Sequence, residues 1–131
     1  MYTKYCNCGY ECGECFNDVK VRNINYGYNL ADPHNVYIGR NKNLGGPSPL
    51  ANRYHIGRDG SRENVILKYH QWLRGEWLLE NSEAKAELIR LCHIFREEGG
   101  LNLICHCSPK PCHGNIVRDA IIGIVKNNLD I

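Results

Sequence analysis

The amino-acid sequence predicts one small domain of mixed α/β class with an N-terminal appendage. Three short apolar stretches have the length and pattern of strands: residues 19–24, 35–39 and 101–105. Three longer segments repeat apolar residues at the spacing of helices: those that follow Ser61 and Ser82, and residues 112–127. A chain of 131 residues has room for one domain with a modest core. We therefore predict an appendage over residues 1–18 and an α/β ligand-binding domain over residues 19–131.

The first two predicted strands lead into a long loop. Residues 19–24 alternate apolar and polar side chains, which is typical of a half-exposed strand. Residues 35–39 end at Gly39 and Arg40, where backbone freedom is followed by a fixed positive group. Residues 41–60 are rich in glycine and contain two prolines. We interpret them as a functional loop, because loops of this length in compact domains usually bind a ligand or move.

Capping residues mark the first two predicted helices. Ser61 can cap a helix whose apolar positions are Val65, Ile66, Tyr69, Trp72 and Leu73. We expect Gly75 to end or bend this helix. Ser82 can cap the next one, which Gly99 and Gly100 stop. Its predicted buried stripe is Ala84, Leu88, Leu91, Cys92 and Phe95.

The last strand and the last helix are the most apolar elements. Residues 101–105 are too short for a helix and follow two glycines, so we interpret them as a buried strand. The helix predicted over residues 112–127 is apolar around much of its circumference. We expect it to pack between the sheet and another element, or against a second copy of the chain in a homo-oligomer.

Four closely spaced cysteines define the N-terminal appendage: Cys6, Cys8, Cys12 and Cys15. Residues 1–18 show neither helical nor strand periodicity and cannot form a core unaided. Four thiolates at this spacing favour one structural Zn²⁺, as in a zinc knuckle, and an iron–sulfur cluster is the alternative. Metal binding would supply the folding free energy that such a segment lacks.

Composition narrows the cellular setting. The chain has eight cysteines, no basic and apolar leader, and no apolar run near the roughly 20 residues of a membrane span. We therefore expect a cytoplasmic protein with reduced thiols and no membrane partner. The formal net charge of +2 predicts no strong attraction to nucleic acid.

Residues 105–113 contain the remaining candidate metal ligands and nucleophiles. They lie where the last predicted strand ends and the last predicted helix begins. One interpretation is a second zinc site, formed by Cys105, Cys107, Cys112 and His113, with His106 as a substitute ligand. Strand alternation would turn Cys105 and Cys107 to one side and His106 to the other.

A second interpretation is an anion or nucleophile site at the helix start. Unpaired N–H groups would favour the thiolate of Cys112 there. Cys112 and Arg118 also have the C-x5-R spacing of cysteine phosphatases, although Ile116 and Val117 occupy part of the loop that would cradle the anion. The third interpretation is structural, with buried thiols packing the start of the helix.

A predicted ligand-binding edge combines this segment with the long loop. Arginines bind phosphate or carboxylate, an aromatic ring stacks on a base, and Asn or Asp binds ribose hydroxyls. The predicted ligand-binding residues are Tyr37, Gly39, Arg40, Asn52, Arg53, Arg58, Asp59, Arg62, His106, Cys112, His113, Gly114 and Asn115. Tyr54 belongs to the same edge. We assign no partner to His34, His55, His70 or His93.

Four stretches carry a resemblance to a known family: residues 36–40 (VYIGR), 50–54 (LANRY), 56–62 (IGRDGSR) and 103–115 (LICHCSPKPCHGN). Over about residues 19–125 the chain resembles a bacterial and phage family known only as domain of unknown function 4326. The family usually has Gly-Asn-Pro at residues 51–53 and Asp at position 115, where this chain has Ala-Asn-Arg and Asn.

The resemblance implies a Rossmann-like domain in two or three layers, with a short, mostly parallel sheet. Such sheets bind ligands at the carboxyl ends of their strands, where Gly39-Arg40 and residues 105–107 would lie.

Three functions remain open. The first is a binding module for a nucleotide-derived small molecule, such as an ADP-ribose-like or cyclic nucleotide signal. If phage-encoded, such a module could sequester a host defence signal. The second is an enzyme that cleaves or transfers at the glycosidic bond of a nucleoside or nucleotide, or hydrolyses a phosphate ester. It would use Cys112 or His113 as nucleophile or acid–base group and Arg40 and Arg58 on the substrate. The third is a zinc-stabilised protein-interaction module.

Overall fold

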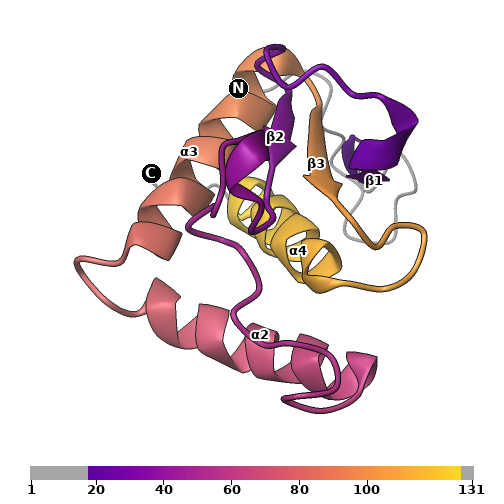
Figure 1. The fold of residues 1–131 in the computed structure, drawn as a ribbon. Helices are drawn as coiled ribbons and strands as arrows, with labels where there is room; N and C mark the ends of the chain where they lie inside the picture. Colours follow the sequence, from indigo (N-terminus) through magenta and orange to yellow (C-terminus); the bar gives the residue numbers. More distant parts are fainter. Residues whose placement is uncertain (1–17, 128–131) are drawn as a thin grey trace.

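The computed structural model describes residues 18–127 and confirms the mixed α/β class (Figure 1). Its strands are β1 (Val19–Asn23), β2 (Asn35–Tyr37) and β3 (Leu101–Cys105). Its α-helices are α2 (Arg62–Trp77), α3 (Glu83–Glu98) and α4 (His113–Lys126). Two short 3-10 turns, η1 (Ile24–Tyr26) and η2 (Lys42–Leu44), lie in the connections. The predicted zinc ligands Cys6, Cys8, Cys12 and Cys15 lie outside the described residues.

The three described strands form one parallel sheet in the order β1-β3-β2. β3 is central, with Asn23 opposite Cys105 on one side and Tyr37 opposite Ile104 on the other. Since all three strands run the same way, their carboxyl ends share one edge of the sheet. The segments that follow β2 and β3 therefore leave the sheet side by side.

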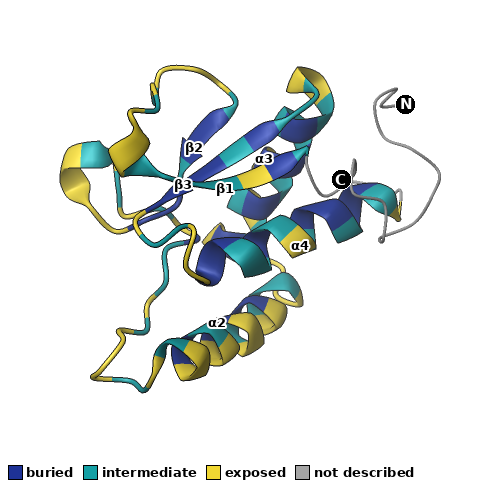
Figure 2. Cartoon of the chain, turned by 90° about the vertical axis from the view of Figure 1, so that its right-hand side faces the viewer, coloured by how far each residue is buried: buried dark blue, intermediate teal, exposed yellow. Residues whose placement is uncertain are grey.

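The two helices that contact the sheet pack against one face of it. α3 and α4 both contact β3 and also contact each other, and α2 packs across them farther from the sheet (Figures 1 and 2). Val19, Val36 and Leu103 of the sheet join the same core cluster as Leu91 and Ile121 of these helices. The prediction that the last helix lies between the sheet and another element is confirmed, because α4 lies between the sheet and α2.

The predicted N-caps are present at both α2 and α3. Ser61 and Asn64 form a reciprocal capping box, and the Ser82 side chain accepts a hydrogen bond from Lys85 N. α3 ends at Gly99, which has φ 77°. The stripe predicted for α3 is buried along its whole length: Ala84, Leu88, Leu91, Cys92 and Phe95.

Two details of α2 differ from the prediction. The helix continues through Gly75 to Trp77, because a glycine weakens a helix without stopping it when the backbone can keep helical angles. Val65, Tyr69 and Leu73 are buried, whereas Ile66 and Trp72 are only partly covered. No helix within residues 18–127 is long and apolar enough to cross a bilayer.

The long loop is anchored to the core at its middle. Leu50 is fully buried, and its carbonyl oxygen accepts a hydrogen bond of 2.6 Å from the hydroxyl of Tyr69, which is also buried. This anchor divides the loop into one part that follows β2 and another part that leads into α2. Both parts face the segment between β3 and α4.

Candidate functional site

A cavity of about 280 Å³ opens at the carboxyl edge of the sheet. The long loop contributes Gly39, Arg40, Asn52, Tyr54, His55 and Ile56 to its lining. The start of α2 contributes Arg62, Val65 and Ile66. The segment from the end of β3 to the start of α4 contributes Cys105, His106, Cys107, Pro111, Cys112 and His113. The two segments singled out from sequence thus form opposite walls of one cavity.

Two buried thiols sit together in the lining of this cavity. Cys105 is the last residue of β3, and Cys112 is the N-cap of α4, so strand and helix deliver their sulfurs to the same place. The Sγ atoms are 3.7 Å apart. The Sγ of Cys105 also accepts a hydrogen bond from Ser108 N, and that of Cys112 accepts one from Gly114 N.

The hydrogen bond between the two sulfurs shifts their pKa values in opposite directions. A hydrogen bond from Cys112 lowers the pKa of Cys105 to about 6, with further help from the backbone N–H of Ser108. The same hydrogen bond, together with burial, raises the pKa of Cys112 above its ordinary value. Both shifts favour a thiolate on Cys105 that accepts a hydrogen bond from the thiol of Cys112. From the helix start alone, the sequence predicts a thiolate at Cys112, which is the N-cap of α4.

His113 is buried at the start of α4 and is held by the backbone of the segment after β2. Its Nε2 lies 2.9 Å from the carbonyl oxygen of Ile38, so Nε2 carries the proton and donates it. The ring also makes an edge contact with Tyr69, with ring centroids 5.1 Å apart. Burial lowers the pKa of His113 to about 4, and the charge of Arg40 adds to this effect. His113 is therefore neutral at physiological pH.

Hydrogen bonds to β1 and α2 fix the segment between β3 and α4. The side-chain amide of Asn23 donates to the carbonyl oxygens of His106 and Ser108, at 3.2 and 3.0 Å. The hydroxyl of Ser108 donates to Val21 O at 3.0 Å. On the other side, Arg62 donates from Nη1 to the carbonyl oxygen of Pro111 at 3.0 Å. Arg62 thus both lines the cavity and ties α2 to the opposite wall.

Tyr37 and His106 form a polar pair beside the cavity. The hydroxyl of Tyr37 accepts a hydrogen bond from Asn41 N, at 3.0 Å, and lies 2.6 Å from Nε2 of His106. Since the hydroxyl oxygen already accepts one hydrogen bond, the natural role of its O–H is to donate to Nε2. With Nε2 as the acceptor, the ring proton of His106 lies on Nδ1.

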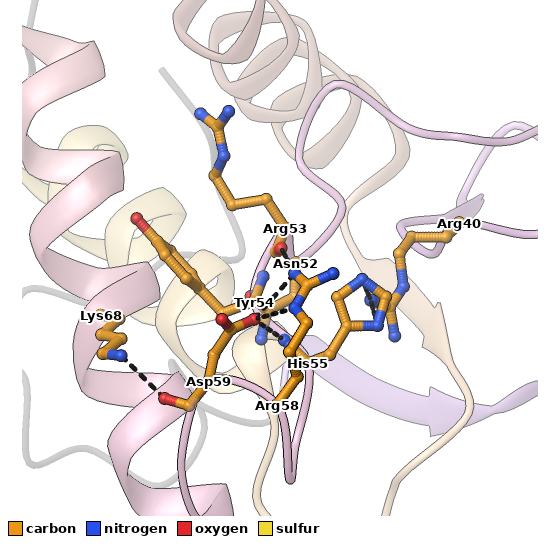
Figure 3. A network of polar contacts seen from close by, with 8 residues as sticks. All are labelled: Arg40, Asn52, Arg53, Tyr54, His55, Arg58, Asp59 and Lys68. Carbon is orange, nitrogen blue, oxygen red and sulfur yellow. Dashed lines mark hydrogen bonds and ion pairs between the residues drawn. The ribbon is translucent and has the colours of Figure 1, made fainter.

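Arg40 and His55 supply the exposed polar rim of the cavity (Figure 3). Arg40 Nη1 lies 2.8 Å from Nδ1 and 2.7 Å from Nε2 of His55. Desolvation and the charges of Arg40 and Arg58 lower the pKa of His55. Sequence reasoning assigned His55 no partner, because a histidine in an irregular loop has no periodicity that would place it.

Several predicted ligand-binding residues have structural partners instead of lining the cavity. Arg58 and Asp59 form an ion pair of 2.8 Å, and Asp59 accepts a hydrogen bond from His55 N, which closes a tight turn of the loop (Figure 3). Arg53 lies over the ring of Trp72, at 5.4 Å from its centroid. The lining of the cavity does not include Arg53, Arg58 or Asp59. A charge pattern in sequence cannot distinguish an arginine that faces a ligand from one that faces a neighbouring carboxylate.

Gly114 and Asn115 serve the geometry of the helix start. A Cβ on Gly114 would lie 2.8 Å from Cγ1 of Val21, so only glycine fits where α4 approaches β1. The Asn115 side chain accepts a hydrogen bond of 2.9 Å from Cys112 N and completes the capping box of α4.

The second predicted metal site is assembled only in part. Cys105 and Cys112 meet, and Cys107 lines the same cavity, while His113 directs Nε2 to a carbonyl oxygen. Within residues 18–127, no three His, Cys, Asp or Glu side chains are grouped so as to hold a metal ion. His106, expected from strand alternation to point away from the cysteines, also lines the cavity, because β3 ends at Cys105 and the alternation ends with it.

Comparison with known protein families matches residues 21–123 to the Domain of unknown function (DUF4326). The chain belongs to this family. The DUF4326 match spans both walls of the cavity and leaves the N-terminal cysteines outside it. Comparisons with curated proteins and with solved structures give no match.

Proposed function

We propose that the cavity at the carboxyl edge of the sheet binds a nucleotide-derived small molecule through its phosphate group. The observation that carries this proposal is the charge of the lining. Arg40 and Arg62 face the cavity, and no Asp or Glu lines it within the described part of the chain. Guanidinium groups with no competing carboxylate favour a phosphate or a carboxylate as ligand.

The volume of the cavity supports a ligand of mononucleotide size. Ligand cavities usually measure about 300–1,000 Å³, and this one, at about 280 Å³, lies just below that range. A nucleoside monophosphate, or a cyclic mononucleotide, has suitable dimensions. A larger molecule such as an ADP-ribose derivative would place one of its halves inside and leave the other at the rim.

The remaining lining divides into groups suited to a sugar and a base. Tyr54 offers an aromatic ring, and Asn52 offers an amide on the same wall. Opposite them, His106 presents a ring N–H, and Val65 and Ile66 add apolar surface. The position at the carboxyl ends of parallel strands supports a Rossmann-like mode of binding.

A second candidate function is favoured by the charge on Cys105. A thiolate in the cavity lining is a nucleophile, so an enzyme acting on a nucleoside or nucleotide would use Cys105, with Cys112 as its hydrogen-bond donor. His113 is neutral and its Nε2 proton is engaged by Ile38 O, which makes it a poor acid–base group. Replacement of Cys105 by Ser would then abolish turnover while binding persists.

The biological role that we propose for a phage-encoded copy is sequestration. A cavity with an anion-binding rim and no complete catalytic set would hold a cytoplasmic nucleotide signal of the host without consuming it. The cysteines of residues 1–18 would then add a zinc-stabilised segment to this binding domain.

Release of ligand from the purified protein tests the proposal. The protein is denatured, the supernatant is searched for nucleotides by mass spectrometry, and the refolded or ligand-free protein is screened by thermal shift against mononucleotides, cyclic nucleotides and ADP-ribose. We expect at least one phosphate-bearing compound to raise the melting temperature and the corresponding nucleoside to have a much smaller effect. Equal shifts with and without phosphate, or no shift at all, would count against the proposal.

A further inference from the structure

The sulfur pair in the cavity lining has a geometry suited to reversible covalent chemistry. Cys105 and Cys112 come from two different elements, yet their Sγ atoms are 3.7 Å apart and hydrogen-bonded. A disulfide bond has a sulfur–sulfur distance of roughly 2.05 Å, so the two sulfurs need to approach by less than about 2 Å to form one. Cys105 and Cys112 are free in the structure.

We propose that Cys105 and Cys112 form a thiol-oxidation site that a peroxide converts into a reversible disulfide. The site does not depend on the ligand of the cavity. The donors around it assign a role to each sulfur. Each sulfur accepts one backbone hydrogen bond, Cys105 from Ser108 N and Cys112 from Gly114 N. Cys105 accepts a further one from Cys112, so Cys105 is the sulfur that attacks, and Cys112 is the one that resolves.

The reaction balances with hydrogen peroxide as oxidant. The thiolate of Cys105 attacks one peroxide oxygen, the O–O bond breaks, and the products are a sulfenic acid on Cys105 and hydroxide. Cys112 Sγ then attacks the sulfur of the sulfenic acid, the S–O bond breaks, and water leaves with the proton of Cys112. The two sulfurs lose two electrons in total, and the peroxide gains them. A dithiol reductant reverses the reaction by thiol–disulfide exchange.

Among the cysteines of residues 18–127, those that line the cavity, and that an oxidant in it can reach, are this pair and Cys107. Cys105 and Cys112 both line the opening, although each is buried, with 1% and 4% of its surface exposed. Cys92, by contrast, is fully buried in α3, within the core cluster. Cys107 lines the same cavity and is the competitor that an experiment must distinguish.

Peptide mapping tests the proposal on the full chain. Trypsin does not cut between a lysine and a proline, so Lys110-Pro111 stays intact and residues 97–118 form one peptide with Cys105, Cys107 and Cys112. Protein treated with hydrogen peroxide is denatured and alkylated with iodoacetamide. We expect the oxidised peptide to carry one alkyl group, on Cys107, and the peptide from protein treated with dithiothreitol to carry three.

Variants assign the bond and keep the test independent of folding defects. Cys107→Ser should leave the peroxide-induced disulfide intact, whereas Cys105→Ser and Cys112→Ser should abolish it, with far-UV circular dichroism to confirm that each variant is folded. Fragmentation of the wild-type peptide gives the same assignment without any substitution. Three alkyl groups after oxidation, or a bond that includes Cys107, would overturn the proposal.

Discussion

His113 shows how one buried side chain links the site to the stability of the protein. Its ring is buried and neutral because burial lowers its pKa to about 4, whereas in the unfolded chain the pKa is near the ordinary 6.5. Between these two values the unfolded state binds a proton that the folded state does not. The free energy of unfolding therefore falls as the pH drops from 6.5 toward 4, by up to about 3 kcal/mol from this residue.

His113→Gln should flatten this pH dependence. A glutamine amide can still donate to Ile38 O, yet it does not titrate. Urea unfolding of wild type and variant at several pH values between 4 and 7 isolates the contribution, since the carboxylates titrate alike in both proteins. We expect the difference in unfolding free energy between wild type and variant to change by about 2–3 kcal/mol across this pH range. If the unfolding free energies of wild type and variant change in parallel with pH, His113 does not govern the pH dependence of stability.

At the scale of single residues, the sequence located the candidate site but did not show which of its groups carry a charge. Cys112 and His113 were singled out because a helix begins there, and the N-cap confirms the position. The identity of the thiolate depended on Cys105, seven residues earlier, and on a hydrogen bond that only the turn between them creates. Pairwise contacts of this kind have no signature in a single sequence.

At the scale of elements, the junction between α4 and the sheet depends on Gly114. A Cβ there would meet Val21 Cγ1 at 2.8 Å, Ile38 Cδ1 at 3.2 Å and Cys112 Sγ at 3.3 Å. Gly114→Ala should therefore push the start of α4 from the sheet and cost about 1–3 kcal/mol of unfolding free energy.

Gly75→Ala is the matched control on another helix. Gly75 lies inside α2 with no atom within 4 Å of an added Cβ, so alanine should stabilise the protein by about 0.5–1 kcal/mol through helix propensity. Chemical denaturation measures both variants. We expect Gly114→Ala to lower the unfolding free energy and Gly75→Ala to raise it. An unchanged unfolding free energy in Gly114→Ala would show that the contact between α4 and β1 is loose.

Sequence periodicity predicted the helices well and the loop poorly. The stripe of α3 was foreseen residue by residue, because a helix that packs on one side must repeat apolar residues every three or four positions. Leu50, in contrast, is fully buried in a stretch without periodicity, held by Tyr69 from α2. Arg53 and Arg58 were expected at the ligand for their charge alone, and the fold pairs them with Trp72 and Asp59.

At the scale of the whole molecule, the zinc content of the purified protein tests whether the metal binds to the N-terminal appendage or to the α/β domain. The proposed donors for a closed zinc site are Cys6, Cys8, Cys12 and Cys15, whereas residues 18–127 bring together no group of three donors. We expect about one zinc per chain in the purified full-length protein and none after removal of residues 1–17. Elemental analysis of both proteins, with circular dichroism to verify folding, makes the measurement. Zinc retained by the shortened protein would place a metal in the cavity region.

The cavity at the carboxyl edge of the parallel sheet lies between the segments that follow β2 and β3, and our central claim is that it binds a phosphate-bearing ligand. Arg40 faces this cavity, whereas the exposed Arg74 on α2 lies outside its lining and provides a control of equal charge. Calorimetric titration with the phosphate-bearing compound found in the thermal-shift screen measures the affinity of wild type, Arg40→Ala and Arg74→Ala. We predict that Arg40→Ala weakens binding by at least about tenfold, the equivalent of one charge-assisted hydrogen bond, and that Arg74→Ala does not change it. Equal affinities for all three proteins would contradict the claim.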